Sequence, residues 1–302
     1  MWKGWRPGVS LDGKTAIVTG AGAGLGRAEA LALAAAGASV VVNDVSDAAQ
    51  LVADEIEAEG GKAVAVTGDV SESATADALL TAAVDHFGGL HVLVNNAGVL
   101  RDRMLFSMSD EEWDTVLRVH LRGHFLLSRN AGAYWRDKSK VDGAPVYGRV
   151  VNTASESFLL GAPGQPNYGA AKAGIAALTV STARGLSRYG VRANAICPRA
   201  RTAMTEGVFG ADAPEGIDPL SVDHVAPFVS FLCSPESDRV NGQVFLVYGG
   251  MVALMRPPSV EQRFDTVNGT WTAEELAGSV GGYFADRDPE RMFSASEIMS
   301  LP

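Results

Sequence analysis

A glycine-rich segment between a β-branched run and an alanine-rich run constrains this chain more than any other feature. Residues 15–18 (Thr-Ala-Ile-Val) favour a buried strand, and residues 27–34 (Arg-Ala-Glu-Ala-Leu-Ala-Leu-Ala) favour a helix. In such a strand–turn–helix unit, glycines let the backbone approach a pyrophosphate, whose charge is met by amide N–H groups at the helix N-terminus. The segment therefore predicts a dinucleotide-binding βαβ unit in which the cofactor contacts Gly20, Gly24, Leu25 and Gly26.

The residue after the second predicted strand indicates which dinucleotide binds. Residues 39–43 form this strand, and Asp44 follows it, eighteen residues after Gly26. A carboxylate there can accept hydrogen bonds from the adenosine ribose and would repel a 2′-phosphate. Residues 20–26 contain no Lys or Arg, so the sequence favours NAD over NADP. Arg27 is the main reservation, because it is close enough to the turn to reach a phosphate.

A possible base lies in residues 165–172, Gln-Pro-Asn-Tyr-Gly-Ala-Ala-Lys. Small and apolar residues follow, which is typical of a helix packed closely on a sheet. On that helix Tyr168 and Lys172 lie one turn apart on the same face. A free tyrosine has a pKa of about 10, and a neighbouring ammonium group lowers it. Taken alone, Tyr-x-x-x-Lys would more simply be an ordinary helix-surface pair.

Four motifs in order resemble the single-domain short-chain dehydrogenase/reductase family, from about residue 11 to residue 250. They are T-G-x-x-x-G-x-G at 19–26, N-N-A-G at 95–98, Ser155, and Tyr168-x-x-x-Lys172. The resemblance implies a Rossmann-type α/β fold with a doubly wound, seven-stranded parallel sheet in residues 1–250. It also implies an oxidoreductase that uses NAD, or less readily NADP, to interconvert a secondary alcohol and a ketone.

The resemblance further implies roles for individual residues. Tyr168 would remove the hydroxyl proton, Ser155 would orient the reacting oxygen, and Lys172 would lower the tyrosine pKa and hold the ribose. Some of these positions also have simpler structural explanations, since Asp69 could belong to the start of the next helix and buried asparagines satisfy backbone groups. The implied cofactor surface consists of Gly20, Gly24, Leu25, Gly26, Asp44, Asp69, Val70, Asn96, Ala97, Gly98, Tyr168, Lys172, Pro198 and Thr202.

Two positions depart from the family pattern. His120 stands where most members have an asparagine that is thought to hold a water in the proton relay. A histidine can form hydrogen bonds at both ring nitrogens, so His120 is either a catalytic candidate or a structural residue. Arg199 stands where a glycine is common. Arg199 and Arg201 could meet an anionic substrate or be solvated loop charges, and Thr202 and Thr205 could bind a carboxamide or a phosphate.

The substrate is suggested by a closer resemblance. Residues 101–103, 113–114 and 118–125 are similar to the dehydrogenase part of the peroxisomal multifunctional β-oxidation enzyme and its bacterial relatives. This resemblance implies a 3-hydroxyacyl-CoA substrate with a fatty or steroid-derived acyl chain. A free hydroxysteroid or a 3-oxoacyl thioester is an alternative substrate. A dinucleotide-binding scaffold or sensor without turnover is a more remote alternative.

Composition narrows the partners and the compartment. The net charge of −10 argues against nucleic acid as a partner, and the two cysteines, Cys197 and Cys233, indicate a reducing compartment. We expect a cytoplasmic protein without a membrane segment, because the first eight residues lack the apolar core of a signal peptide and no run of eighteen apolar residues occurs. No cluster of His, Cys and carboxylates suggests a metal. The family resemblance implies a homodimer or homotetramer.

Strands and helices are expected to alternate along the remaining chain. A helix that begins near Ser109 carries apolar residues and histidines at helical spacing, including Trp113, His120 and Phe125, and much of it should be buried. Further strands are expected at 63–66, 90–94, 149–153, 191–196 and 244–247, and further helices at 47–59, 73–87 and 222–233.

Two segments lack a clear family counterpart. Residues 206–219 are rich in Gly, Ala, Asp and Pro, and we expect a mobile lid over the substrate. Residues 251–302 contain a helix start at Thr272 and many aromatic residues. We expect an ordered extension of the same domain, which either covers the substrate cleft or contacts a neighbouring subunit.

Overall fold

The computed structural model describes residues 8–206, 210, 214, 216–267, 269–289, 291–295 and 298. It contains two compact units, Met1–Met255 and Arg256–Pro302. The strands of the first unit are β1 (Thr15–Val18), β2 (Ser39–Asp44), β3 (Lys62–Thr67), β4 (Val92–Asn95), β5 (Gly148–Thr153), β6 (Val191–Pro198), β7 (Val244–Tyr248) and β8 (Met251–Leu254). Its helices are α1 (Gly24–Ala35), α2 (Ala48–Ala58), α3 (Ser73–Phe87), α4 (Asp110–Leu117), α5 (Gly123–Asp142), α6 (Ser157–Leu160), α7 (Pro166–Leu186) and α9 (Ala226–Cys233).

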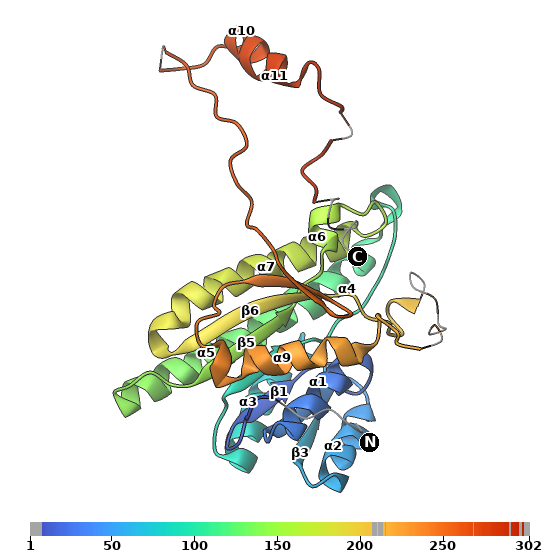
Figure 1. The fold of residues 1–302 in the computed structure, drawn as a ribbon, viewed down its shortest axis with the longest axis vertical. Helices are drawn as coiled ribbons and strands as arrows, with labels where there is room; N and C mark the ends of the chain where they lie inside the picture. The colour runs from blue at the N-terminus through green and yellow to red at the C-terminus, as the bar shows by residue number, and fades with distance from the viewer. Residues whose placement is uncertain are drawn as a thin grey trace. The chain divides into compact units, whose positions relative to one another are not determined.

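The strands form one sheet in the order β3-β2-β1-β4-β5-β6-β7-β8 (Figure 1). Strands β1 to β7 are parallel, so the doubly wound parallel sheet of the prediction is confirmed. An eighth strand, β8, runs antiparallel to β7. It follows a turn at Gly249 and Gly250, and Gly249 has a φ of 52° that favours glycine. The boundary expected at residue 250 therefore falls inside a hairpin.

Alternating side chains along the strands explain the three layers. In β1 and β2, Val18 and Val42 pack with apolar residues of α1, α2 and α9 on one face of the sheet. Ile17 and Val41 point the other way and pack with α3, α5 and α7. Both faces are covered, which is why these strands are almost continuously apolar. The strand order reverses between β1 and β4, and a crevice opens there at the carboxyl ends of the strands.

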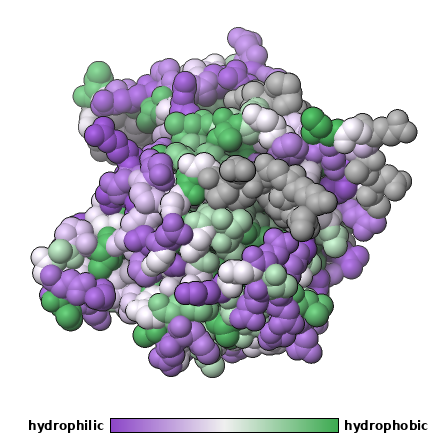
Figure 2. Space-filling model, turned by 60° about the horizontal axis from the view of Figure 1, so that its bottom comes forward, coloured by the Kyte–Doolittle hydropathy of each residue, from purple (hydrophilic) through white to green (hydrophobic). Residues whose placement is uncertain are grey.

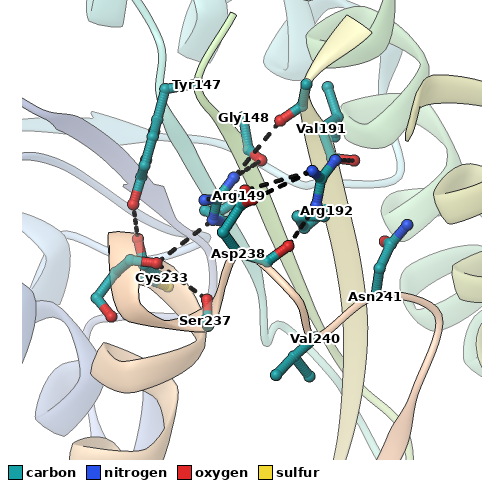
Figure 3. A network of polar contacts seen from close by, with 12 residues as sticks. Tyr147, Gly148, Arg149, Val191, Arg192, Cys233, Ser237, Asp238, Val240 and Asn241 are labelled. Carbon is teal, nitrogen blue, oxygen red and sulfur yellow. Dashed lines mark hydrogen bonds and ion pairs between the residues drawn. The ribbon is translucent and has the colours of Figure 1, made fainter. Parts of the chain in front are cut away.

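A polar network around Arg149 holds the opposite, amino-terminal ends of the strands (Figure 3). Arg149 is buried, and its guanidinium forms an ion pair with Asp238 at 3.1 Å. Arg192 on β6 reaches the same carboxylate at 3.3 Å. The Tyr147 ring stacks 4.2 Å from the Arg149 guanidinium carbon, and its hydroxyl donates to the Cys233 carbonyl oxygen at 2.5 Å. The network therefore links β5 and β6 to the end of α9.

The helix expected from Ser109 is interrupted. A single π-helical turn, η2 (Arg118–Arg122), separates α4 from α5. His120, His124 and Val116 are buried as expected, whereas Trp113 is 37% exposed and Phe125 is 43% exposed. Much of the stretch is therefore buried, as expected, and these two aromatic rings lie on its outer face.

Two features bear on the environment of the chain: the hydropathy of its surface, and the length and apolar character of its helices. The face in Figure 2 mixes hydrophilic and hydrophobic residues, with many hydrophilic residues toward its periphery. Within the described ranges, every helix falls short of the length and apolar character needed to cross a membrane.

The second unit contains α10 (Ala273–Leu276), the π turn η6 (Ala277–Gly281) and α11 (Gly282–Phe284). The predicted helix start at Thr272 is confirmed, because Thr272 and Glu275 form a reciprocal capping box. Tyr283 packs edge-on against Phe264 at a centroid distance of 5.3 Å. In the segment expected to form a lid, residues 207–209, 211–213 and 215 lie outside the described residues.

Candidate active site

A cavity of about 490 Å³ lies at the carboxyl ends of the parallel strands. Most residues expected at the site line it: Gly20, Gly24, Leu25, Asp44, Asp69, Val70, Asn96, Ala97, Gly98, His120, Tyr168, Lys172, Pro198 and Thr202. Segments that are far apart in the sequence therefore meet in one place. Two expected residues, Gly26 and Ser155, lie outside the cavity lining.

The glycine turn is held by close backbone contacts. A Cβ on Gly20 would lie 2.7 Å from the Ala97 Cα, and a Cβ on Gly26 would lie 2.3 Å from the Gly20 carbonyl oxygen. Gly26 therefore lets α1 pack beneath the turn and does not itself face the cavity. Ala23 is the N-cap residue of α1, and among the described residues no side chain forms a capping hydrogen bond at this helix start. The first N–H groups of α1 are thus available to a ligand beside Gly24 and Leu25, which suits a pyrophosphate.

Asp44 is fixed at the wall of the cavity. Its Oδ2 accepts a hydrogen bond from the Gly22 N–H at 3.0 Å, and its Oδ1 accepts from the Ser46 N–H at 3.1 Å. Arg27, which could have reached a phosphate, instead forms a bidentate ion pair with Glu55 on α2. The carboxylate therefore lies at the cavity without this arginine beside it.

Asp69 and Asn96 each have a local structural contact as well as a place in the cavity wall. The Asp69 Oδ1 accepts from the Ser71 N–H at 2.8 Å and stabilises the turn that precedes α3. The Asn96 side chain donates to the carbonyl oxygens of Thr19 and Gly20 at 3.1 and 3.2 Å, which ties β4 to the glycine turn. A structural role and a cofactor contact are compatible at both positions.

Helix α7 brings Tyr168 and Lys172 to the cavity, close to Ser155. Its first turn contains Pro166, whose missing N–H and fixed φ suit that position. Lys172 Nζ donates to the Thr153 carbonyl oxygen at 2.5 Å and lies 5.3 Å from the centre of the Tyr168 ring. Ser155 follows β5, and its hydroxyl is close enough to Tyr168 to act against the rise in the pKa of the phenol. The three expected catalytic side chains therefore lie together.

Burial dominates the titration of this pair. It raises the pKa of Tyr168 to about 12, and the hydrogen bond from Ser155 only partly opposes this. Burial also lowers the pKa of Lys172 to about 7. In the chain by itself, the removal of the phenol from water outweighs the neighbouring groups, and the lowering of the tyrosine pKa by Lys172 stays a prediction.

His120 contacts both the backbone and Tyr168. Its Nε2 lies 2.8 Å from the Val99 carbonyl oxygen, and its ring meets the Tyr168 ring edge-on at 5.3 Å. Burial, with Lys172 as a second cause, lowers the pKa of His120 well below its usual value. Its Nδ1 is buried and has no partner among the residues that the structure describes. A Cβ on Gly98 would lie 2.3 Å from the imidazole, so this glycine gives the ring its place.

The two arginines after β6 do not behave as expected. Arg199 forms a bidentate ion pair with Glu156, and Arg201 pairs with Asp218 at 3.1 Å. All four side chains are at most 15% exposed. They are therefore neither solvated loop charges nor charges presented to a substrate. Thr205, unlike the arginines, lines the cavity, and its hydroxyl also donates to the Ala200 carbonyl oxygen at 2.7 Å.

Several residues of the cavity wall were not predicted from the sequence. Thr115, Arg118 and Val119 line the cavity from α4 and η2, and Asn43 lines it from β2. The first three are helically spaced from one another, since Thr115 is three residues from Arg118 and four from Val119. They are not helically spaced from His120, so that residue gave no signal for them.

Comparisons with known proteins agree with this geometry. A family model described as short chain dehydrogenase matches residues 14–211. Hydroxyacyl-CoA dehydrogenase ChsB1 of Mycobacterium tuberculosis is 62% identical over 299 residues, which cover 96% of this chain and 94% of that protein. Peroxisomal multifunctional enzyme type 2 of Mus musculus is 43% identical over 255 residues, which cover 81% of this chain and 33% of that longer enzyme.

A solved structure extends the agreement to three dimensions. The crystal structure of a short chain dehydrogenase from Mycobacterium avium matches with a TM-score of 0.83 and 45% identity, and the match covers 92% of this chain and 97% of that one. Motifs, fold, cavity and relatives lead to one family. The chain belongs to the short chain dehydrogenase family and is an oxidoreductase that acts on CH–OH groups.

Proposed function

We propose that this protein is an NAD-dependent 3-hydroxyacyl-CoA dehydrogenase whose substrate carries a fatty or steroid-derived acyl chain. The observation that carries the proposal is the 62% identity, over nearly the whole chain, to a hydroxyacyl-CoA dehydrogenase. Tyr168 and Lys172 line the cavity and Ser155 acts on Tyr168 from just outside the lining, a grouping that supports oxidation of a secondary alcohol.

The choice of NAD rests on Asp44 and Arg27. A 2′-phosphate on the adenosine ribose would approach the fixed Asp44 carboxylate, whereas a free 2′-hydroxyl could donate to it. Because Arg27 is held by Glu55, it does not offer a compensating charge at the cavity. These contacts favour the unphosphorylated cofactor.

The proposed reaction is a proton transfer coupled to a hydride transfer. Tyr168 accepts the hydroxyl proton of the substrate, Ser155 holds the same oxygen, and the carbinol carbon becomes a ketone. A bound NAD would supply the hydride acceptor, and its positively charged ring would favour the phenolate form of Tyr168. Lys172, held by the Thr153 carbonyl oxygen, would be the residue that holds the ribose. We further propose that His120, with its buried Nδ1, takes the relay position that an asparagine has in most relatives.

The test is NADH formation by the purified protein with a panel of 3-hydroxyacyl-CoA esters and free hydroxysteroids, each with NAD and with NADP. Turnover of the CoA esters, faster with NAD, is the expected result. Turnover of free steroids alone would keep the chemistry and exclude the thioester substrate. Binding of NAD without turnover of any compound would contradict the proposal and favour a scaffold or sensor.

A further inference from the structure

A buried ion pair joins the two loops on either side of the catalytic residues. Glu156 directly follows Ser155 after β5, and Arg199 directly follows Pro198, the last residue of β6. The Arg199 Nε and one terminal nitrogen donate to the two carboxylate oxygens of Glu156, each at 2.8 Å. The two side chains are only 11% and 15% exposed. Such a bidentate pair has a defined geometry and is screened much less than a surface pair.

Both partners are also anchored to their surroundings. The Arg199 N–H donates to the Val247 carbonyl oxygen on β7 at 2.9 Å, and the guanidinium carbon lies 5.6 Å from the centre of the Tyr248 ring. The Glu156 carbonyl oxygen accepts from the Leu159 N–H at 2.8 Å, in the first turn of α6. The ion pair therefore connects two anchored points and joins the loops just beyond the paired ends of β5 and β6.

The position of these loops relative to the cofactor follows from the sheet. Asp44 lies after β2 and the glycine turn lies after β1, so the ribose and pyrophosphate occupy that side of the cavity. The reactive end of the dinucleotide then extends toward β5 and β6, where Tyr168 also lies. Pro198, Ala200 and Thr202 form the cavity wall at that end.

We propose that Glu156 and Arg199 are positioning residues: their ion pair holds Ser155 and the 198–202 segment at the separation that aligns the substrate with the hydride acceptor. The inference rests on the proposed function. Neither side chain belongs to the cavity lining, so both act through their neighbours in the sequence. Hydride transfer is sensitive to this alignment, since a misplacement of about 1 Å can cost roughly a hundred-fold in rate.

The variants Glu156→Gln and Arg199→Gln and their combination test the pair. Each single change should lower kcat by roughly ten- to a hundred-fold. The Kd for NAD should stay within a few-fold, because the ribose and pyrophosphate contacts lie elsewhere. The primary isotope effect with substrate deuterated at the carbinol carbon should increase as hydride transfer becomes slower than other steps. The double variant should be no slower than the slower single variant, since both changes remove one interaction.

Asp238→Asn provides a matched control. It breaks another ion pair of a buried arginine, Arg149, at the opposite end of β5 (Figure 3). It should lower the melting temperature without changing kcat or the isotope effect. Glu156 and Arg199 variants that resemble this control, with a lower melting temperature alone, would overturn the positioning role, as would independent, multiplicative losses in the double variant.

A second readout does not require the substrate. Reduced nicotinamide emits more strongly when a protein holds it rigidly, so NADH emission in the complex reports on how well the ring is held. The Glu156 and Arg199 variants should lose part of the enhancement seen with the unaltered protein, and Asp238→Asn should keep it. If the unaltered protein turned over no substrate while this difference appeared, the ion pair would keep its role and the proposed function would fail. Equal emission from all forms would overturn the inference.

Discussion

Tyr168 is the residue on which the proposed chemistry depends most directly. Replacing it with phenylalanine keeps the ring, and thus the packing against His120, but removes the group that accepts the proton. We expect Tyr168→Phe to lower kcat by about a hundred- to ten-thousand-fold, the usual contribution of general base catalysis. The Kd for NAD should change by no more than a few-fold.

Steady-state kinetics and calorimetric titration with NAD would check this expectation. Tyr189→Phe is a suitable control, because Tyr189 lies in the turn after α7, where its hydroxyl accepts from Arg188 at 2.6 Å. Undiminished turnover of Tyr168→Phe would remove Tyr168 from the mechanism.

Glu29 is a buried carboxylic acid that should make stability depend on pH. It is fully buried in α1, and neither carboxylate oxygen has a hydrogen-bond partner in the described part of the chain. Burial raises the pKa of Glu29 from 4.5 to about 8. Between these values the folded protein binds the proton and the unfolded chain releases it. The contribution of Glu29 to the free energy of unfolding therefore falls as the pH rises from about 4.5 to 8.

Glu29→Gln should remove this contribution. Relative to the unaltered protein, the free energy of unfolding of the variant should increase by roughly 3 kcal/mol between pH 5 and pH 8. Urea unfolding at several pH values would measure the difference, with the exposed Glu57→Gln as a control that should show none. A constant difference across this range would mean that Glu29 is already ionised in the folded protein.

Some properties of single site residues could be predicted from the sequence, and others could not. Ser155, Tyr168 and Lys172 could be found because their spacing is itself the signal. Arg199 could not be interpreted, because its partner Glu156 lies 43 residues away and only the pairing of β5 with β6 brings them together. The raised pKa of Tyr168 also depends on how completely the fold removes it from water, which the spacing of Tyr168 and Lys172 does not reveal.

Among the elements, α1 and the glycine turn should tolerate change least. A Cβ on Gly26 would lie 2.3 Å from the Gly20 carbonyl oxygen and 2.5 Å from the Asn96 side chain, so α1 would have to move away from the turn. We expect Gly26→Ala to raise the Kd for NAD at least ten-fold, because the first N–H groups of α1 would no longer meet the pyrophosphate.

Gly185→Ala is the matched control for this change. Gly185 lies in α7, and an added Cβ there would meet nothing within 4 Å among the described residues. Alanine should therefore leave NAD binding unchanged and stabilise the helix slightly. Calorimetric titration of both variants with NAD would measure the two Kd values. Equal Kd values would show that close packing at Gly26 is not needed for NAD binding.

The elements themselves were predictable where hydrophobic patterning is strong. The strands of the parallel sheet are β-branched runs, and α3 has the limits expected from its periodicity. The π turn η2 was not predicted, because the one-residue phase shift that it introduces is hard to distinguish from ordinary variation in so short an apolar pattern. Strand β8 was missed because it has only four residues after two glycines, in a region without a family counterpart.

At the scale of the whole molecule, the second unit can be tested by deletion. We propose that residues 256–302 serve substrate binding or subunit contact and are dispensable for folding of the first unit. A chain that ends at Met255 should keep its circular dichroism spectrum and a cooperative melting transition, because the core clusters lie within residues 11–247. Loss of the cooperative transition would show that the first unit depends on the second.

The same truncated chain would distinguish the two roles. A higher KM with an unchanged mass in solution would favour a place near the substrate, and a lower mass would favour a subunit contact. With either result, the Kd of the truncated chain for NAD should not change.

The helix surface formed by Leu117, Leu121 and Phe125 is a candidate subunit contact for the expected homodimer or homotetramer. These residues border a groove on α4, η2 and α5, and Phe125 is 43% exposed. We propose that a second copy of the chain covers this surface. Phe125→Asp should then reduce the mass measured by analytical ultracentrifugation, with exposed Val141→Asp as the control. An unchanged mass would place the contact elsewhere.

The two ends of strand β5 have different roles: one supports the structure of the sheet and the other lies at the candidate active site. Arg149, near its start, belongs to the network that ties the strands together, whereas Ser155, just beyond its end, belongs to the proposed catalytic group. Substitutions that change substrate specificity can therefore accumulate at one end of the strand while the other end preserves the fold. In a diverging lineage the two ends can drift separately, so new specificities need not be accompanied by compensating changes in the scaffold.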